Sequence, residues 1–265
     1  MKIRRILLTG DDGYNSIGTR LLVYFLKNKY ELSLAATRDQ QSGVGGLVHA
    51  LRGGIWGKAK VDGLPAIWVD GSPVDAIECA RTFFKQPFDL TISGINLGVN
   101  LGANIISSGT FAAAYRALSL GVSPRALAVS WDVHYRQFER KHSGGESLKA
   151  YLKYPGEVAS KAIQQIILNN FWGAKLLNLN LPGKETHELR FARLLADCYN
   201  YWPPAVMEKN TGKFYFPRGN QTNRTAKLEF DTAAVAKGYL SLTPIDPEML
   251  EQRIFSRLKA KIIKL

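Results

Sequence analysis

The sequence predicts an α/β fold with a mostly parallel central sheet. Short aliphatic runs alternate along the chain with segments whose apolar residues recur at helical spacing, a pattern typical of strands joined by crossover helices. The chain has 265 residues, a length that suits one elaborated α/β domain with a sizeable core. Because right-handed crossovers join consecutive parallel strands, we expect helices to flank the sheet.

The first half of the chain contains the clearest of these elements. Residues 5–9 (RILLT) form an aliphatic run, and residues 18–30 then show helical spacing. Residues 31–37 (ELSLAAT) indicate a second strand. Residues 88–96 (FDLTISGIN) indicate a further strand, which we expect to break at Gly94.

The pattern repeats further along the chain. Residues 107–121 predict an alanine-rich helix that opens with Ser and Thr, and residues 125–130 (RALAVS) predict a buried strand. Residues 135–147 are polar and contain glycine, so we expect a loop there. A helix over residues 156–170 and a late strand within residues 174–183 complete the predicted core.

From Tyr199 the composition changes to aromatic, proline and polar turn residues, which favours an extended hairpin-like excursion. We therefore expect an α/β core over residues 1–198 and a protruding oligomerisation arm over residues 199–230. Residues 231–265 are expected to return, as strand and helix, to a core or to a partner subunit. Within them, residues 250–265 predict a basic amphipathic helix that packs its Ile and Leu face.

Composition and charge restrict the classes of function. The chain carries 35 Lys and Arg against 22 Asp and Glu, a net charge of +13, which favours anionic partners. The basic residues are scattered and match no nucleic-acid-binding module, so we do not expect a nucleic acid partner. No apolar run approaches the roughly 18–20 residues of a membrane span, and no signal peptide is evident, so we expect a soluble cytoplasmic protein without a membrane partner. Cys79 and Cys198 lack CxxC spacing, which argues against a disulfide framework or a thiolate zinc site.

Polar side chains follow several of the predicted strands. Asp11 and Asp12 come directly after the first strand, Ser42 follows the second, and Asn96 follows the strand that contains Gly94. Because ligands of open parallel sheets bind beyond the carboxyl ends of the strands, these side chains can converge. Two carboxylates with a hydroxyl and an amide oxygen suit one hard divalent ion, Mg²⁺ or Mn²⁺.

The helix that opens at residues 107–110 (SSGT) adds a candidate anion site. Its unpaired N–H groups, the hydroxyls of Ser108 and Thr110 and the helix dipole favour a phosphate group. A divalent ion beside a phosphate site indicates phosphoester chemistry, with Asp11 or Asp12 orienting the nucleophile. Each feature also has a plainer interpretation, because Asp-Asp-Gly suits a turn, Ser42 and Asn96 suit loops, and SSGT suits a helix cap. The four histidines (His49, His134, His142 and His187) show no metal-ligand spacing and are assigned surface or hydrogen-bonded structural roles.

Several separated motifs, taken in order, resemble the SurE family of metal-dependent 5′/3′-nucleotidases, also called survival protein E or stationary-phase acid phosphatases. The opening ILLTGDDGYNSIG is similar to the family's ILLSNDDG…GI, and DGSPVDAIECA is similar to its GTPADCV segment. The densest match is DLTISGINLGVNLGANIISSGTFAAAYRALSLGVSPRALAVS, and later LNLNLP and FDTAAVAKGYLSLTP also match family motifs. The resemblance spans nearly the whole chain.

The resemblance implies a Rossmann-like core with a C-terminal arm exchanged between the subunits of a homodimer or tetramer. It implies that one divalent ion per subunit is held by Asp11, Asp12, Ser42 and Asn96. Phosphate is implied to bind around Asn100, Ser108, Gly109 and Thr110. The implied activity is hydrolysis of nucleoside 5′- and 3′-monophosphates, with short polyphosphate as a further substrate of some members.

Three positions depart from the family pattern. Gly10 stands where the family usually has Asn before the acidic pair, and this removes an amide that could orient the carboxylates. Asn104 and Ser107 replace an acidic residue and a Tyr beside the expected phosphate pocket, and Arg116 replaces an acidic or apolar residue. A SurE-like protein that binds metal and nucleotide with weak or lost turnover is therefore the alternative function.

Other folds with acidic residues after a strand fit less well. A receiver domain needs an Asp after its third strand, where this chain has Ser93, Gly94 and Asn96. Haloacid-dehalogenase phosphatases need two aspartates separated by one residue, whereas Asp11 and Asp12 are adjacent. A dinucleotide-binding domain needs GxGxxG directly after a strand, and this element is absent from the start of the first predicted helix.

Overall fold

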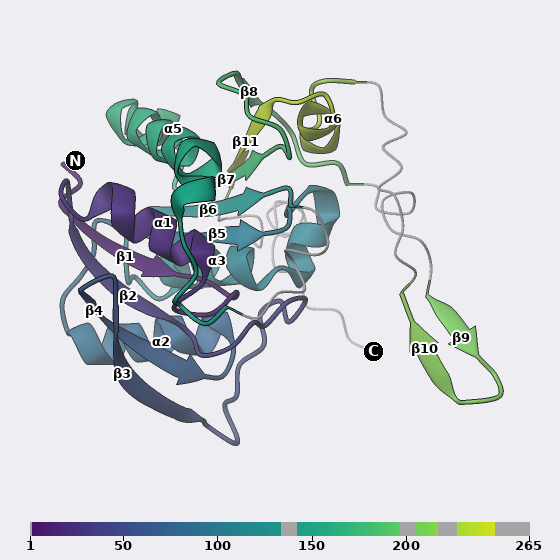
Figure 1. Cartoon of the computed structure of the whole chain (residues 1–265), viewed down its shortest axis with the longest axis horizontal. Coiled ribbons are helices and arrows are strands. Elements are labelled where there is room, and N and C mark those ends of the chain that lie inside the picture. Colours follow the sequence, from purple (N-terminus) through teal and green to yellow (C-terminus); the bar gives the residue numbers. More distant parts are fainter. Residues whose placement is uncertain (1, 134–141, 197–204, 217–226, 247–265) are drawn as a thin grey trace, which may run out of the picture.

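The computed structural model describes residues 2–133, 142–196, 205–216 and 227–246, and one large sheet dominates these residues (Figure 1). Its nine strands are β1 (Arg5–Thr9), β2 (Glu31–Thr37), β3 (Ile55–Val61), β4 (Leu64–Asp70), β5 (Leu90–Leu97), β6 (Ala126–Trp131), β7 (Leu176–Leu181), β8 (Leu189–Phe191) and β11 (Leu240–Ile245). Across the sheet they lie in the order β3-β4-β2-β1-β5-β6-β7-β11-β8.

The centre of the sheet is parallel, as the sequence predicts. β1 pairs in parallel with β2 and β5, and β6 and β7 continue the parallel order beyond β5. Antiparallel pairs occur toward the two sides of the sheet, where β3 pairs with β4 and β11 pairs with β7. The predicted fold class is therefore confirmed. The loops that follow β1, β2 and β5 leave the same edge of the sheet, where ligands of such folds bind.

Helices flank this sheet. The longer ones are α1 (Ile17–Leu26), α2 (Pro73–Phe84), α3 (Gly109–Ser119) and α5 (Val158–Leu168). Shorter helical turns are η1 (Gly102–Ser107), η2 (Lys149–Tyr151), η3 (Leu152–Glu157), η4 (Asn170–Gly173) and α6 (Asp231–Ala236). Over the described ranges of the chain, the structure has no helix long and apolar enough to cross a lipid bilayer.

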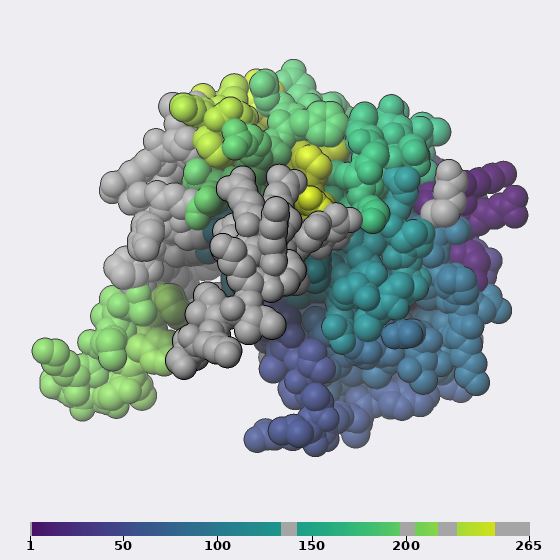
Figure 2. Space-filling view, turned by 180° about the vertical axis from the view of Figure 1, so that it is seen from behind, coloured from purple at the N-terminus to yellow at the C-terminus, as the bar shows by residue number. Residues whose placement is uncertain are grey.

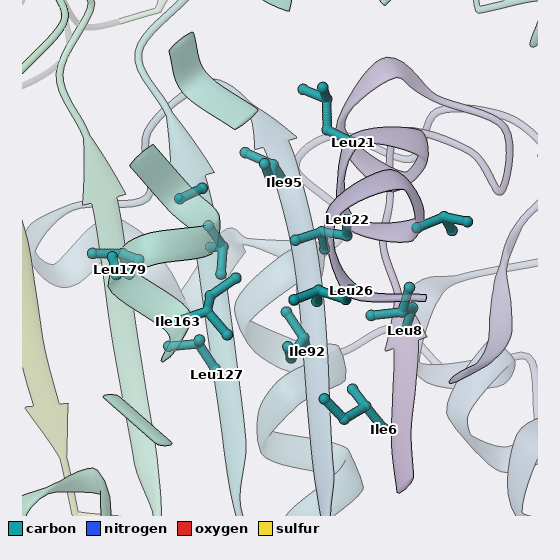
Figure 3. Close-up of a cluster of buried hydrophobic side chains, with 14 of the residues drawn as sticks. Ile6, Leu8, Leu21, Leu22, Leu26, Ile92, Ile95, Leu127, Ile163 and Leu179 are labelled. Atoms are coloured by element: carbon teal, nitrogen blue, oxygen red, sulfur yellow. The ribbon is translucent and has the colours of Figure 1, made fainter. Parts of the chain in front are cut away.

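Alternation along the strands decides which helices cover which face. Successive side chains of a strand point to opposite faces, so Ile6 and Leu8 share one face of β1 and Leu7 takes the other. Ile6 and Leu8 pack in the large core with the leucines of α1 and with Ile163 of α5 (Figure 3). Leu7 packs in a second cluster with Ile77 of α2 and with alanines of α3. Both faces of the parallel sheet are therefore buried, as such sheets require.

The predicted break at Gly94 is wrong. β5 continues to Leu97, with a shift of its register against β6 between Ser93 and Asn96. Gly94 has a φ of +129°, and a Cβ there would overlap the carbonyl oxygen of Val129. The glycine therefore permits close contact with β6 rather than ending the strand, and the strand carries Asn96 to the edge of the sheet.

A second hairpin lies apart from the main sheet. β9 (Val206–Glu208) and β10 (Lys213–Tyr215) pair in antiparallel fashion and project from the body, as Figures 1 and 2 show in green. This hairpin lies within the segment predicted to be an arm, although the predicted boundaries at residues 198 and 230 stay predictions. The predicted terminal helix over residues 250–265 lies outside the described residues.

The chain returns to its own sheet after this excursion. β11 inserts between β7 and β8, so the segment after residue 231 completes the core of the same chain. The base of the excursion is closed by backbone hydrogen bonds, because Arg193 N–H donates to Glu229 and Asp231 N–H donates to Arg193. The Asp231 carboxylate also accepts from the N–H groups of Leu195 and Gly102.

Candidate metal and anion site

The two adjacent aspartates occupy a fixed turn at the end of β1. Only 4% of Asp11 and 5% of Asp12 is exposed, which is unusual for ionisable side chains. The Asp11 carbonyl oxygen accepts from the N–H of Gln41 at 2.7 Å, so the loop after β2 is bonded to the turn. Gly13 has a φ of +99° and closes the turn, a backbone conformation that glycine adopts without strain.

Asp11 lies against the first turn of α3. Thr110 Oγ1 donates to Asp11 Oδ1 at 2.6 Å, and the backbone N–H of Thr110 also faces this carboxylate. A Cβ built on Gly109 would lie only 2.9 Å from Asp11 Oδ2 and 2.9 Å from Pro73 Cγ. The missing side chain of Gly109 therefore gives the carboxylate its place at the positive end of the helix.

Asp12 joins two other segments of the same edge. Its Oδ2 atom accepts from the backbone N–H of Leu97 at 2.6 Å, at the end of β5. Its Oδ1 atom accepts from Gln40 Nε2 at 3.1 Å, in the loop after β2. The two carboxylates thus hold together the ends of three neighbouring strands and the start of α3.

The two buried carboxylates lie without a cationic side chain among their described neighbours. Burial raises the pKa of Asp11 to about 6, although the hydrogen bonds from Thr110 oppose this rise. Burial and the charge of Asp11 raise the pKa of Asp12 well above its ordinary value, against the hydrogen bonds from Leu97 and Gln40. In the described part of the chain, no Lys or Arg forms an ion pair with either carboxylate. Two buried carboxylates without a counter-ion fit a site for a divalent cation.

Asn96 meets the requirements of a further oxygen ligand. It is 8% exposed, lies one residue before the Leu97 N–H that binds Asp12, and donates from Nδ2 to Gly98 O at 2.7 Å. Because the amide nitrogen makes that bond, the amide oxygen is the atom of this side chain suited to a cation, and no described residue donates a hydrogen bond to it. The donor set contains only oxygen atoms, and the described residues form no cluster of three or more His, Cys, Asp or Glu side chains. This composition favours Mg²⁺ or Mn²⁺ over Zn²⁺.

Ser42 lies next to Gln41, and it is Gln41 that bonds the loop after β2 to the aspartate turn. It is exposed and follows Gln41, whose N–H binds the Asp11 carbonyl, but the structure gives it no hydrogen bond to either carboxylate. Its role as a ligand stays a prediction. The structure thus brings Asp11, Asp12 and Asn96 together and places Ser42 on the adjoining loop.

The start of α3 shares its polar groups between the helix cap and the carboxylate pair. Ser108 is the N-cap residue, and its Oγ accepts from Phe111 N at 3.1 Å, so the plainer capping interpretation is confirmed for this atom. Thr110 uses its hydroxyl on Asp11. Gly45 N–H donates to Ser107 O at 2.9 Å, which bonds the loop after β2 to the start of the helix. Phosphate binding by Ser108, Gly109 and Thr110 stays a prediction.

Asn100 is held by the sheet rather than turned outward. Its N–H donates to Asn180 Oδ1 at 2.8 Å, and its carbonyl accepts from the side-chain amides of Asn178 at 2.8 Å and Asn180 at 3.0 Å. Its own Nδ2 donates to Ser130 Oγ at 2.8 Å. The predicted contact of Asn100 with phosphate stays a prediction, and the structure shows an additional role for it in anchoring the loop.

Gln40 was not identified from the sequence as a site residue, and the structure gives partners to two residues named there without one. Gln40 belongs to the polar segment after β2 that drew attention only through Ser42. His49 Nδ1 lies 2.6 Å from Asp75 Oδ2 in the capping box of α2, which confirms the predicted hydrogen-bonded role of that histidine. Arg116 forms an ion pair with Glu78, which explains a basic residue at that family-atypical position.

Comparisons with known proteins show the family and the fold. The family model described as survival protein SurE matches residues 6–201. The chain is 31% identical over 263 residues to the 5′-nucleotidase SurE of Chloroflexus aggregans, covering 96% of this chain and 97% of that protein. It is 28% identical over 262 residues to the 5′-nucleotidase SurE of Methanococcoides burtonii, covering 97% and 98%. The crystal structure of the SurE protein from Aquifex aeolicus superimposes with a TM-score of 0.73 at 23% identity, covering 96% of this chain and 98% of that one, which shows the shared fold.

Proposed function

Because the chain belongs to the survival protein SurE family, we propose that it is a metal-dependent nucleotidase that releases phosphate from nucleoside 5′- and 3′-monophosphates. One observation carries this proposal above the others. Two buried carboxylates without a described counter-ion lie where the first turn of α3 begins, so a site for a cation and a site for an anion are adjacent. The names of the similar proteins support the nucleotide as the substrate.

Asp11, Asp12, Ser42 and Asn96 are the residues that would hold one Mg²⁺ or Mn²⁺ per subunit. When bound, such an ion supplies positive charge that polarises a phosphoryl oxygen and acidifies water. Asp12 or Asp11 orients the attacking water, because a buried carboxylate held by Leu97 or Thr110 keeps a fixed direction.

The phosphate is held by the start of α3. The Thr110 N–H faces Asp11 and the Phe111 N–H binds Ser108 Oγ, so among the described contacts the donors that remain for phosphate oxygens are the Gly109 N–H and the Ser108 hydroxyl hydrogen. Asn100 completes the expected anion site from the preceding loop.

A phosphate-release screen tests the proposal. The substrates are 5′- and 3′-nucleoside monophosphates, short polyphosphate and an aryl phosphate, each with Mn²⁺, with Mg²⁺ and with EDTA. We expect release from the nucleotides with metal and its loss with EDTA. Turnover that persists without metal would refute the metal-dependent mechanism.

The same screen separates the alternative function. A protein that binds nucleotide and Mn²⁺ in calorimetry but releases no phosphate would be a SurE-like binding protein that has lost turnover. Gly10 and Ser107 are the observations behind this alternative, since the amide and the Tyr usual at these positions are absent. Polyphosphate release above nucleotide release would instead link the charge of +13 to a longer anionic substrate.

We also propose that the chain assembles as a homodimer or tetramer by exchange of its arm. The hairpin exposes large apolar side chains that a single chain leaves in contact with water: 79% of Met207, 67% of Phe214 and 69% of Phe216 is exposed. Light scattering at micromolar concentration is expected to give at least the dimer mass. A strictly monomeric mass would contradict this proposal.

A further inference from the structure

The loop from β5 to α3 connects the two halves of the candidate site. It starts beside Leu97, whose N–H binds Asp12, and it ends at Thr110, whose hydroxyl binds Asp11. Gly102 N–H is held by the Asp231 carboxylate at 2.7 Å, and Gly98 N–H is held by Trp131 O at 2.8 Å. Between these two anchors the loop depends on Asn100.

Asn180 binds Asn100 in the way that a paired strand would. Its side-chain amide accepts from the N–H and donates to the carbonyl of the same residue, at 2.8 Å and 3.0 Å. Asn178 adds a second donor to that carbonyl, and Ser130 accepts from the Asn100 side chain. One buried amide therefore satisfies both backbone groups of a residue that belongs to no strand.

The face of the sheet that offers these amides is not optimised for stability. Asn178 and Asn180 are fully buried on β7, and they alternate with leucines that fill the opposite face. Their registered neighbours on β11 are Thr243 and Ser241. Within the described residues, the buried hydroxyls of these two side chains have no hydrogen-bond partner, and Asn178 Oδ1 has none either. Apolar side chains here would avoid the cost of burying unpaired polar groups, so a function other than stability explains this polar face.

We propose that Asn180, assisted by Asn178, is a positioning residue that fixes the loop over residues 98–108 and thereby sets the phosphate-binding start of α3. This inference rests on the proposed nucleotidase function. Metal binding and phosphate binding then depend on different elements. The carboxylates and Asn96 lie at the ends of β1 and β5, whereas the anion donors lie at the start of α3, beyond the anchored loop. Loss of the anchor is expected to weaken phosphate binding and to leave metal binding intact.

The test is Asn180→Leu, with Ser241→Ala as its matched control. The leucine removes both hydrogen bonds to Asn100 at similar volume. The control removes a buried hydroxyl on the adjacent strand β11 that has no hydrogen-bond partner among the residues that the structure describes. In the Asn180→Leu variant we expect about tenfold weaker binding of inorganic phosphate and a similar rise in KM, which corresponds to the loss of one or two hydrogen bonds. The affinity for Mn²⁺ is expected to stay within about twofold of the wild-type value, because the substitution removes no contact of Asp11, Asp12 or Asn96. Ser241→Ala is expected to have the wild-type affinity for both phosphate and Mn²⁺.

Hydrogen exchange supplies a readout that does not need activity. Amides of residues 98–108 are expected to exchange faster in Asn180→Leu, while those of β1 and β5 keep their protection, because only the loop loses an anchor. A wild-type protein without phosphatase activity would refute the proposed function, and this exchange experiment would still decide the positioning role. Unchanged loop exchange together with unchanged phosphate affinity would overturn the inference.

A second variant guards against a folding defect. Ser130→Ala removes the acceptor of the Asn100 side chain with little change of volume. We expect it to weaken phosphate binding by about threefold, as loss of one neutral hydrogen bond predicts. Should Asn180→Leu fail to fold, wild-type phosphate affinity and wild-type loop exchange in Ser130→Ala would reject the positioning role.

Discussion

Gly109→Ala is expected to damage the candidate site through one added methyl group. In the native structure that Cβ would lie 2.9 Å from Asp11 Oδ2, 2.9 Å from Pro73 Cγ and 3.1 Å from Asp11 Cβ. These separations are shorter than ordinary van der Waals contacts, so Asp11 or the start of α3 must move. Either movement strains the 2.6 Å hydrogen bond between Thr110 Oγ1 and Asp11 Oδ1.

The size of the effect follows from overpacking in a rigid environment. Inserting a methyl group into a well-packed site costs about 1–3 kcal/mol of the free energy of unfolding. For a chain of this size, each kcal/mol lowers the melting temperature by about 2–4 °C. Displacement of one of two carboxylate ligands is further expected to weaken Mn²⁺ binding by about tenfold or more, within the range seen when ligand orientation is disturbed.

The assay combines thermal unfolding of the metal-free protein with calorimetric titration of Mn²⁺. Gly46→Ala is the matched control, because Gly46 is exposed in the loop after β2 and a Cβ there would contact nothing within 4 Å. The control is expected to behave as the wild type in both measurements. If Gly109→Ala kept both the melting temperature and the Mn²⁺ affinity of the wild type, the close packing of Asp11 on α3 would be refuted.

Three further predictions concern buried charge and the space around a glycine. Asp12→Asn removes a buried charge beside Asp11. At pH 8 the free energy of unfolding of the metal-free variant is therefore expected to exceed that of the wild type by at least about 1 kcal/mol, and Mn²⁺ is expected to stabilise the variant no further. Equal Mn²⁺-induced shifts of the melting temperature in both proteins would contradict this. Burial opposes ionisation of Glu146, but hydrogen bonds from the Ser143 N–H, the Ser143 hydroxyl and the Gly144 N–H outweigh it and lower the pKa of Glu146 to about 2. Because the pKa is lower in the folded state, ionised Glu146 stabilises the fold above the unfolded-state pKa of 4.5. Glu146→Gln is therefore expected to lower the free energy of unfolding in urea by about 1–3 kcal/mol at pH 7, and by progressively less as the pH falls toward 2. A difference that does not depend on pH would reject this cause. Gly10→Asn restores the family's usual amide where a Cβ meets only ordinary contacts at 3.7–3.8 Å, so turnover is expected to rise with an unchanged melting temperature, and a fall in kcat would show that the glycine is required.

The strands of the core could be predicted because burial on both faces leaves an uninterrupted aliphatic signal. β1 and β2 begin and end where residues 5–9 and 31–37 indicate. The antiparallel pair of β3 and β4 was missed, since β3 is mostly exposed and contains Lys58 and Lys60, and β4 contains Pro65 and Asp70, so neither strand has an uninterrupted aliphatic signal. Asp62 and Gly63, both with positive φ, form its two-residue turn, and this Asp-Gly pair is the signal that could have identified the hairpin.

The candidate site was predictable where its residues directly follow a strand. Asp11 and Asp12 meet that condition, and both prove to be buried at the edge where the loops converge. The partners of these carboxylates were not predictable in the same way. Thr110 is 99 positions from Asp11 and Leu97 is 85 positions from Asp12, so the contacts depend on the order of strands across the sheet. The anchoring of Asn100 by β7 likewise requires that order, and it gives the later LNLNLP motif a role that its resemblance to the family did not supply.

The closed base of the arm allows the arm to vary in length and sequence without disturbing the sheet. Backbone hydrogen bonds join residue 193, where the chain leaves the sheet, to residue 231, where it returns. The residues between them therefore form an insertion at a single point of the sheet. Doubling the length of such an insertion adds only about 0.6 kcal/mol of closure entropy. The arm can therefore lengthen, shorten or be replaced by an unrelated module while the order of the parallel strands, whose ends carry the candidate site, is preserved. The exposed hairpin and the candidate site can thus change separately within one chain.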